Sequence, residues 1–130
     1  MHLNVYTLSH REAGSAPVSF LLTSLLLITV FLGLIQGALI MHSRNVLTDI
    51  AGEAARQGAR LDATSSDAVA YANSRAGQFK DFSVNTAEKT ADGRDLIVVQ
   101  VSASLPVLGL FTVPAKLHAS GRAVIESDNY

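Results

Sequence analysis

The stretch Gly14–Met41 reads GSAPVSFLLTSLLLITVFLGLIQGALIM and contains no charged residue. A bilayer core about 30 Å thick requires roughly 20 apolar residues at about 1.5 Å each, so this stretch is long enough to span it. A buried helix of a soluble protein is the alternative interpretation. A chain of 130 residues, however, has little surface with which to cover a helix that is apolar on every face. We therefore predict a transmembrane helix over 15–41 and membrane lipid as its surroundings.

The bulk composition excludes several classes of function. A formal net charge of −1 argues against nucleic-acid binding, because phosphate contacts require a basic surface. The absence of cysteine excludes disulfides, thiolate metal sites and thiol nucleophiles. The length suits one membrane helix and one small domain.

Residues 1–14 precede the predicted membrane helix and are mostly polar. A secretory signal peptide would have a shorter apolar core and a small-residue cleavage site after it, and nothing following Met41 resembles one. Arg11 lies before the span, whereas Arg44 and further arginines lie after it. The count of basic residues therefore leaves the orientation open.

Two glycines, Gly33 and Gly37, stand four residues apart inside the apolar stretch. This spacing places both on one helix face, where another helix can approach closely, and Gln36 can hydrogen-bond across such a contact. The alternative is that glycine is simply common in membrane helices.

The helical pattern continues beyond the membrane, over 42–61. Small and apolar residues recur there at i, i+3, i+4 and i+7, namely Leu47, Ile50, Ala51, Ala54, Ala55, Gly58 and Leu61. This stripe predicts one continuous helix from about Ala16 to Arg60, in which a membrane anchor extends into a soluble spine.

Residues 62–126 are expected to form a small domain, followed by a tail over 127–130. The polar break Asp62–Asp67 precedes a second helix, predicted over Asp67–Phe79. From Phe82 onward apolar residues alternate with polar ones, which indicates strands.

Asp92-Gly93 marks a hairpin turn, and the strands Leu96–Leu105 and Ala115–Ile125 follow. The apolar connection Val107–Val113 either packs against the sheet or membrane, or forms an exposed patch for a neighbouring subunit. The predicted fold class is α+β, with a long helix, a short helix and about three antiparallel strands.

Catalytic chemistry is not indicated. The histidines, His2, His10, His42 and His118, are scattered and lack the partners of a metal site, and no cofactor motif is present. No serine has the surroundings of a nucleophile. A small hydrolase or metal enzyme that uses His118 with Glu126 or Asp95 is the enzymatic alternative, and it requires those side chains to converge.

Three motifs together resemble the TadE-like family of minor pilins and pseudopilins of tight-adherence (Flp-type) pilus systems. The first is REAGSAPVSF, followed by the apolar run, and its Ala16-Pro17 variant looks most like actinobacterial members. The second is SRNVLTDIAGEAARQGAR, in which the resemblance is carried by Arg44, Asn45, Ala54, Ala55, Arg56, Gly58, Ala59 and Arg60. The third comprises VQVSASLPVLGLF and HASGRAVIE near the C-terminus.

This resemblance implies a pilin-like fold and a non-catalytic role in pilus assembly. It implies that a prepilin peptidase cuts between Gly14 and Ser15 and removes a leader, 1–14. It also implies a cytoplasmic N-terminus and an extracytoplasmic C-terminal domain, reaching the cell surface if the protein enters the pilus. The implied partners are the peptidase, other pilins or pseudopilins, and the secretion platform.

One position departs from the family pattern. The family usually carries an acidic residue at the fifth mature position, where this chain has Ser19. In pilins that carboxylate is thought to pair with a neighbouring subunit's N-terminal amine, and serine cannot supply the charge. A minor, tip or assembly role is therefore favoured over a main filament subunit. The remaining alternative is an uncleaved single-pass anchor that scaffolds another envelope complex.

Overall fold

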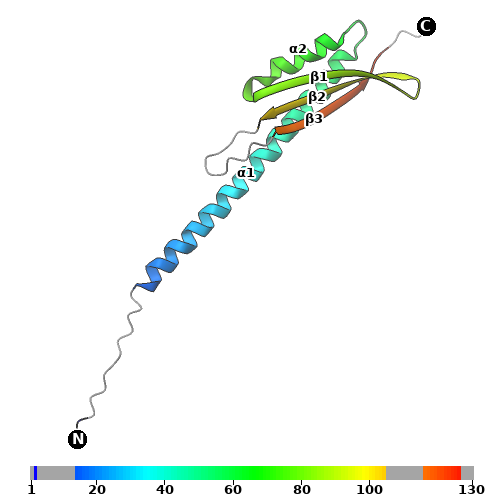
Figure 1. Cartoon of the computed structure of the whole chain (residues 1–130). Coiled ribbons are helices and arrows are strands. Elements are labelled where there is room, and N and C mark those ends of the chain that lie inside the picture. The colour runs from blue at the N-terminus through cyan, green and yellow to red at the C-terminus, as the bar shows by residue number, and fades with distance from the viewer. Residues whose placement is uncertain (1, 3–13, 105–115, 127–130) are drawn as a thin grey trace. The chain divides into compact units, whose positions relative to one another are not determined.

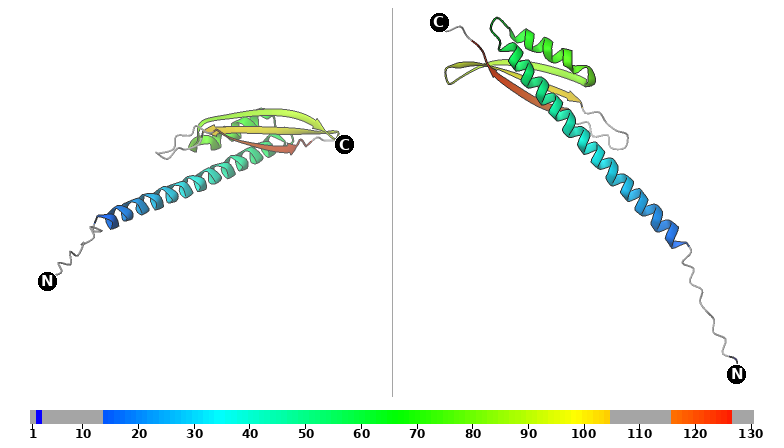
Figure 2. Two further views of the ribbon diagram at one scale, coloured as in Figure 1. Left: turned by 60° about the horizontal axis from the view of Figure 1, so that its bottom comes forward. Right: turned by 180° about the vertical axis from the view of Figure 1, so that it is seen from behind.

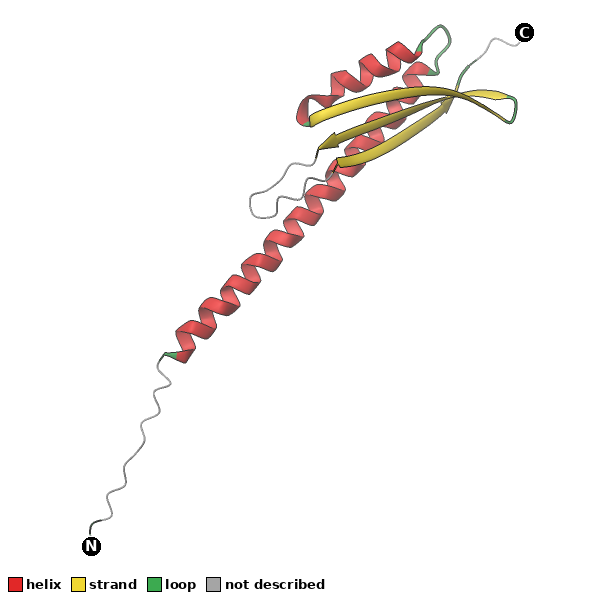
Figure 3. Ribbon diagram, viewed as in Figure 1, coloured by secondary structure: helices red, strands yellow, loops and turns green. Residues whose placement is uncertain are grey.

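The computed structural model describes residue 2, residues 14–104 and residues 116–126. In chain order the elements are α1 (Ser15–Gly58), α2 (Ser65–Arg75), a 3-10 turn η1 (Ala76–Gln78), β1 (Lys80–Ala91), β2 (Arg94–Ser104) and β3 (Lys116–Val124) (Figure 1). The chain forms two compact units, Met1–Gln36 and Gly37–Tyr130. Figure 3 shows that all described strands belong to the second unit.

The described part of the first unit is the N-terminal portion of α1. Its large apolar side chains, from Val18 to Ile35, are exposed. Within the described residues, α1 is the one helix long and apolar enough to cross a membrane, and none of its most apolar window is buried. The hydroxyl of Thr29 donates a 2.8 Å hydrogen bond to the carbonyl of Leu25, so this polar group has its partner inside the helix. A soluble core helix would hide such a surface, whereas a membrane anchor exposes it to lipid.

The second unit contains an antiparallel sheet in the order β1-β2-β3. β1 and β2 form a hairpin in which Ala91 pairs with Arg94 around Asp92-Gly93. Asp92 and Gly93 both have positive φ, 52° and 74°, as a two-residue turn of this kind requires. The predicted hairpin is therefore confirmed at these residues.

One face of the sheet packs on the soluble part of α1 and on α2 (Figure 2). The alternation predicted for β2 is confirmed, because Ile97, Val99 and Val101 are almost fully buried while Gln100 is exposed. The helical stripe supplies the other side of the core. Leu47 is its largest buried side chain, and around it lie Ile50, Ala51, Ala54, Ala55, Ala59, Ala68 and Ala72.

The helices lie close to the sheet because small residues line the interface. A Cβ atom added to Gly121 of β3 would overlap the backbone of Ala51 and lie 2.5 Å from the Gly52 nitrogen. A Cβ at Gly58 would lie 2.7 Å from Cδ1 of Ile97 and 2.8 Å from Cβ of Ala68. Both approaches are too short for any side chain, so glycine is required at each position.

Several element boundaries differ from the sequence prediction. The strand β2 begins at Arg94 rather than Leu96, and β3 covers Lys116–Val124 rather than Ala115–Ile125. The sequence predicts the second helix over Asp67–Phe79, but α2 begins at Ser65 because Thr64 caps it, and it gives way to η1 before Phe79. The first strand begins at Lys80 rather than Phe82, and the register shifts between Lys80 and Ser83. Asp81 has a φ of 51° at this irregularity.

The long helix, short helix and three-stranded antiparallel sheet together form a pilin-like α+β fold, as predicted. Most of the predicted leader, the connection Val107–Val113 and the tail 127–130 lie outside the described residues.

Candidate functional site

The predicted cleavage site coincides with the start of α1. Gly14 lies in a turn and Ser15 is the first helical residue, and both are exposed. A Cβ at Gly14 would meet nothing within 4 Å. The chain thus changes from non-helical to helical backbone at the predicted scissile bond, immediately before an uncharged helix.

The predicted helix-packing residues, Gly33, Gln36 and Gly37, all lie on α1. Added Cβ atoms at Gly33 and at Gly37 would meet nothing within 4 Å, so both positions are open in the described chain. Ser19 lies in the first turns of α1 and is exposed. Gln36 is partly buried, whereas the two glycines are exposed.

The motif of residues 44–60 divides into two sets by burial. Its small members, Ala54, Ala55, Gly58 and Ala59, are buried against the sheet and α2, whereas its polar members, Arg44, Asn45, Arg56 and Arg60, are exposed. The carbonyl of Ala59 accepts a 3.0 Å hydrogen bond from the backbone of Glu126. The small residues therefore hold the helix against the sheet and fix the end of the last strand.

The exposed side of this motif carries one weak ion pair. Arg56 Nη1 lies 3.4 Å from Glu53 Oε2, and Gln57 donates to the other carboxylate oxygen at 3.3 Å. The Arg56 side chain is 77% exposed, so solvent screens the pair, and such pairs contribute about 0–1 kcal/mol. The arginine is not required to hold the fold, which leaves it available for contacts outside the chain.

Comparison with known families connects these features. The family described as TadE-like protein matches residues 14–60, which begin at the predicted cleavage glycine and end after the small-residue motif. This segment is TadE-like. The match does not bear on the bacterial group, so the actinobacterial resemblance stays a prediction. No curated protein and no solved structure gave a match to this chain.

The TadE-like segment supplies all of α1 but neither α2 nor the sheet. It therefore joins the apolar anchor to the small-residue surface on which the rest of the second unit packs. Members of this family are generally non-catalytic and pilin-like.

The residues of the enzymatic alternative are not brought together. His118 is exposed on the side of the sheet away from α1, while Asp95 lies at a position facing the opposite side and accepts a 2.7 Å hydrogen bond from Thr90. Glu126 follows β3 and contacts Ala59 through its backbone. Among the described residues, no group of three or more His, Asp or Glu side chains is arranged to hold a metal ion.

Two features of the structure are not among the sequence predictions. The first is the close packing of Gly121 in the last strand, for which the available signal is that a glycine within a strand often marks a close backbone approach. An open groove between α1 and α2 is lined by Asp49, Glu53, Tyr71 and Arg75 among others, and Arg75 lies 5.6 Å from the centre of the Tyr71 ring. The groove depends on the angle between the helices, which no local pattern encodes.

Proposed function

We propose that this chain is a minor pilin or pseudopilin that assists assembly of a tight-adherence pilus. In this proposal a prepilin peptidase cleaves between Gly14 and Ser15, and the matured α1 then packs with other pilin helices in the membrane. The protein performs no catalysis itself. Its soluble unit lies outside the cytoplasm and its N-terminus lies inside.

The observation that carries the proposal is the coincidence at the N-terminal end of α1. The TadE-like match begins at Gly14, α1 begins at Ser15, and exposed apolar side chains follow directly. Glycine lets the backbone extend into a protease site, and the helix behind it is too apolar to leave the membrane. A membrane-embedded peptidase would therefore find an extended cleavage site directly beside a helix that stays in the membrane.

The open glycines support association through the helix. An added Cβ at Gly33 or Gly37 would meet nothing within 4 Å in the described chain, so a neighbouring helix can reach the backbone there. Ser19 lacks the acidic group that main pilins are thought to use between subunits. This favours a minor or assembly role, in contact with other pilins and the secretion platform.

The proposal is tested by the N-terminal residue of the protein recovered from membranes, determined by mass spectrometry. We expect Ser15 in the native chain and Met1 in a Gly14→Leu variant. Gly77→Leu serves as the matched control, because Gly77 is also exposed with open space around it, and processing should be unchanged. If the native chain begins at Met1, the protein is instead an uncleaved anchor that scaffolds another envelope complex.

A further inference from the structure

The face of the sheet opposite α1 is open to solvent in the described chain; we call it the outer face. The strand register places its side chains in rows that run across β1, β2 and β3. The two central rows carry hydroxyl and amide side chains together with the imidazole of His118. One row contains Ser83, Ser102 and His118, and the next contains Asn85, Gln100 and Ser120. All of these residues except Ser83 line an open depression of about 450 Å³.

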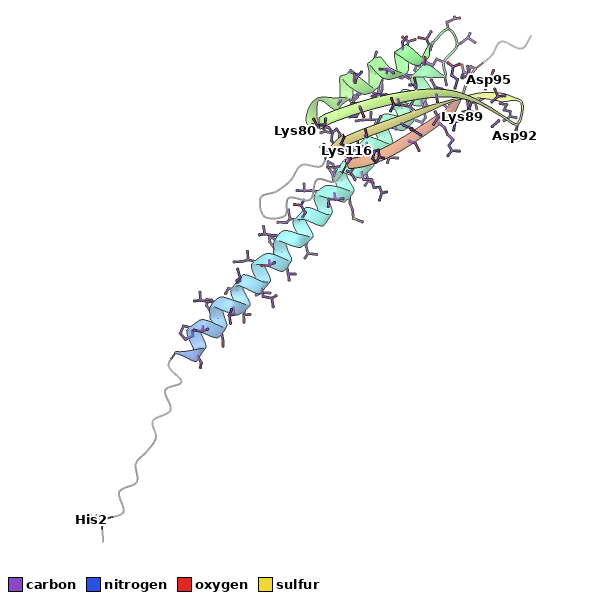
Figure 4. All side chains as sticks on the ribbon, viewed as in Figure 1. His2, Lys80, Lys89, Asp92, Asp95 and Lys116 are labelled. Atoms are coloured by element: carbon purple, nitrogen blue, oxygen red, sulfur yellow. The ribbon has the colours of Figure 1, made fainter. Side chains whose placement is uncertain are left out.

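Basic residues stand at both ends of these polar rows. Lys80 and Lys116 flank Ser104 at one end of the sheet, and Lys89 and Arg122 lie in the two rows nearer the hairpin, as Figure 4 shows for the three lysines. Arg94 follows at the hairpin itself. All five basic side chains are exposed.

The outer face is strongly basic although the whole chain is not. It carries five of the chain's 10 lysines and arginines, while the formal net charge of the chain is −1. Glu88 and Asp95 occupy positions facing the other side of the sheet. Two described carboxylates lie near this face. Asp81 accepts a 3.0 Å hydrogen bond from Ser104, and Asp92 of the hairpin turn lines a pocket with Arg94, Leu96 and Val124.

The spacing of the charges limits what this face can bind. The basic ends are six residues apart along β2, which is about 20 Å at roughly 3.4 Å per residue. The rows between them offer hydroxyl, amide and imidazole groups. A polymer charged at every unit would leave charges opposite these neutral rows, whereas one with neutral, hydroxylated units between its acidic units would match them.

Other partner classes fit less well. The described outer face has no Phe or Tyr on which nucleic-acid bases could stack. Its large apolar side chains are Leu96, Val98 and Val124 near the hairpin, with the small Ala87 and Ala91 beside them, too few for the apolar centre of a protein interface. We propose that the outer face binds an acidic polysaccharide in which acidic and neutral sugars alternate. This proposal does not depend on a role in pilus assembly.

The test uses the full chain in a neutral polyoxyethylene detergent and fluorescently labelled hyaluronate as the probe, with binding followed by anisotropy. We expect binding at low salt that weakens as NaCl rises, since exposed charges are screened beyond about 10 Å at 0.1 M. The double variant Lys116→Glu with Arg122→Glu should weaken binding roughly tenfold or more, because it reverses a charge at each end of the rows.

The matched control is Arg44→Glu with Arg60→Glu, which changes the net charge equally on exposed residues of the helical side. It should bind hyaluronate as the native chain does. Asn85→Ala with Gln100→Ala should weaken hyaluronate binding while leaving weak polyglutamate binding unchanged, because only the sugar uses the central rows. Amide hydrogen exchange of β2 confirms that each variant is folded.

Three outcomes would overturn the proposal. The first is an absence of hyaluronate binding at low salt. The second is equal or tighter binding of polyglutamate or single-stranded DNA, which would indicate an acidic protein or nucleic acid. The third is equal loss in the helical-side control, which would show that binding follows net charge and not the outer face.

Discussion

Gly121 of β3 packs directly against the backbone of Ala51 in α1, with no room for a side chain between them. This approach brings the last strand against the helix and leaves the polar residues on either side of Gly121 on the outer face. One glycine thus couples the packing of the helix to the surface that the sheet presents.

A methyl group at this contact should destabilise the second unit. We expect Gly121→Ala to lower the free energy of unfolding by about 1–3 kcal/mol, because the rigid backbone of Ala51 has to move. Amide hydrogen exchange of β2 in the detergent-solubilised full chain measures this loss. Gly52→Ala is the control, since a Cβ there meets nothing and alanine favours helix by about 0.5–1 kcal/mol. Equal effects of the two substitutions would contradict the close contact.

Leu47 should be the side chain on which the helix–sheet core depends most. It is fully buried among small residues and next to the valines of β2, so Leu47→Ala is expected to cost about 2–5 kcal/mol. Leu61→Ala removes the same atoms from a side chain that is 45% exposed and should cost much less. The comparison uses the same exchange measurement, and a similar loss for both would show that Leu47 is not at the centre of the core.

The cap of α2 should be sensitive to acid. Hydrogen bonds from the backbone N–H of Thr64, at 2.7 Å, and from its hydroxyl, at 3.0 Å, hold the pKa of Asp67 below its usual value of 3.8. A carboxyl group whose pKa is lowered by folding stabilises the fold when the pH is above its pKa in the unfolded chain. This contribution is lost as the pH falls through the pKa in the folded chain. Helix α2 should therefore begin to fray only below pH 3.8.

The pKa itself is measured by the carboxyl carbon shift of Asp67 during an acid titration. Thr64→Ala removes the hydroxyl donor but keeps the backbone donor, so the pKa should rise only part of the way toward its usual value. Asp67→Asn should remove the dependence on this group. A pKa at or above 3.8 in the native chain would mean that the hydrogen bonds do not form in solution.

Packing through the glycine face of α1 can be tested by cross-linking, because the chain has no cysteine of its own. Leu26 lies two helical turns before Gly33 on the same face, and Phe31 lies on the opposite face. We expect Leu26→Cys to form a cross-linked species in membranes and Phe31→Cys to form little. Adding Gly33→Ile to Leu26→Cys should abolish the cross-linked species, because the bulky isoleucine side chain keeps the two helices apart. Cross-linking from both faces alike would argue against a specific contact.

The identity of residue 19 should influence entry into a filament. Ser19→Glu restores an acidic group at the fifth mature position, where it can pair with a neighbouring amine in apolar surroundings. We expect a larger share of this variant in filaments sheared from cells than of the native chain. Ser24→Glu, also on α1 but away from that position, is the control. An unchanged share for Ser19→Glu would show that the missing acid does not restrict the chain to a minor role.

The helices and strands of this protein can be predicted from local sequence. The uncharged run after Gly14, the small-residue stripe from Leu47 to Gly58 and the alternation around Val99 each follow from local chemistry, because helices and strands repeat with fixed periods. The same is true of the turn at Asp92-Gly93 and of the TadE-like motif that ends at Arg60.

How these elements pack together depends on contacts between distant parts of the chain. The contacts of Gly121 with Ala51 and of Gly58 with Ile97 join residues far apart in the chain, and no periodicity relates them. The basic ends and polar centre of the outer face likewise appear only when the strand register aligns Lys80 with Ser104 and Lys116. Local sequence fixes which face of a strand a residue occupies, but register and packing distance depend on which side chains from distant segments fit together.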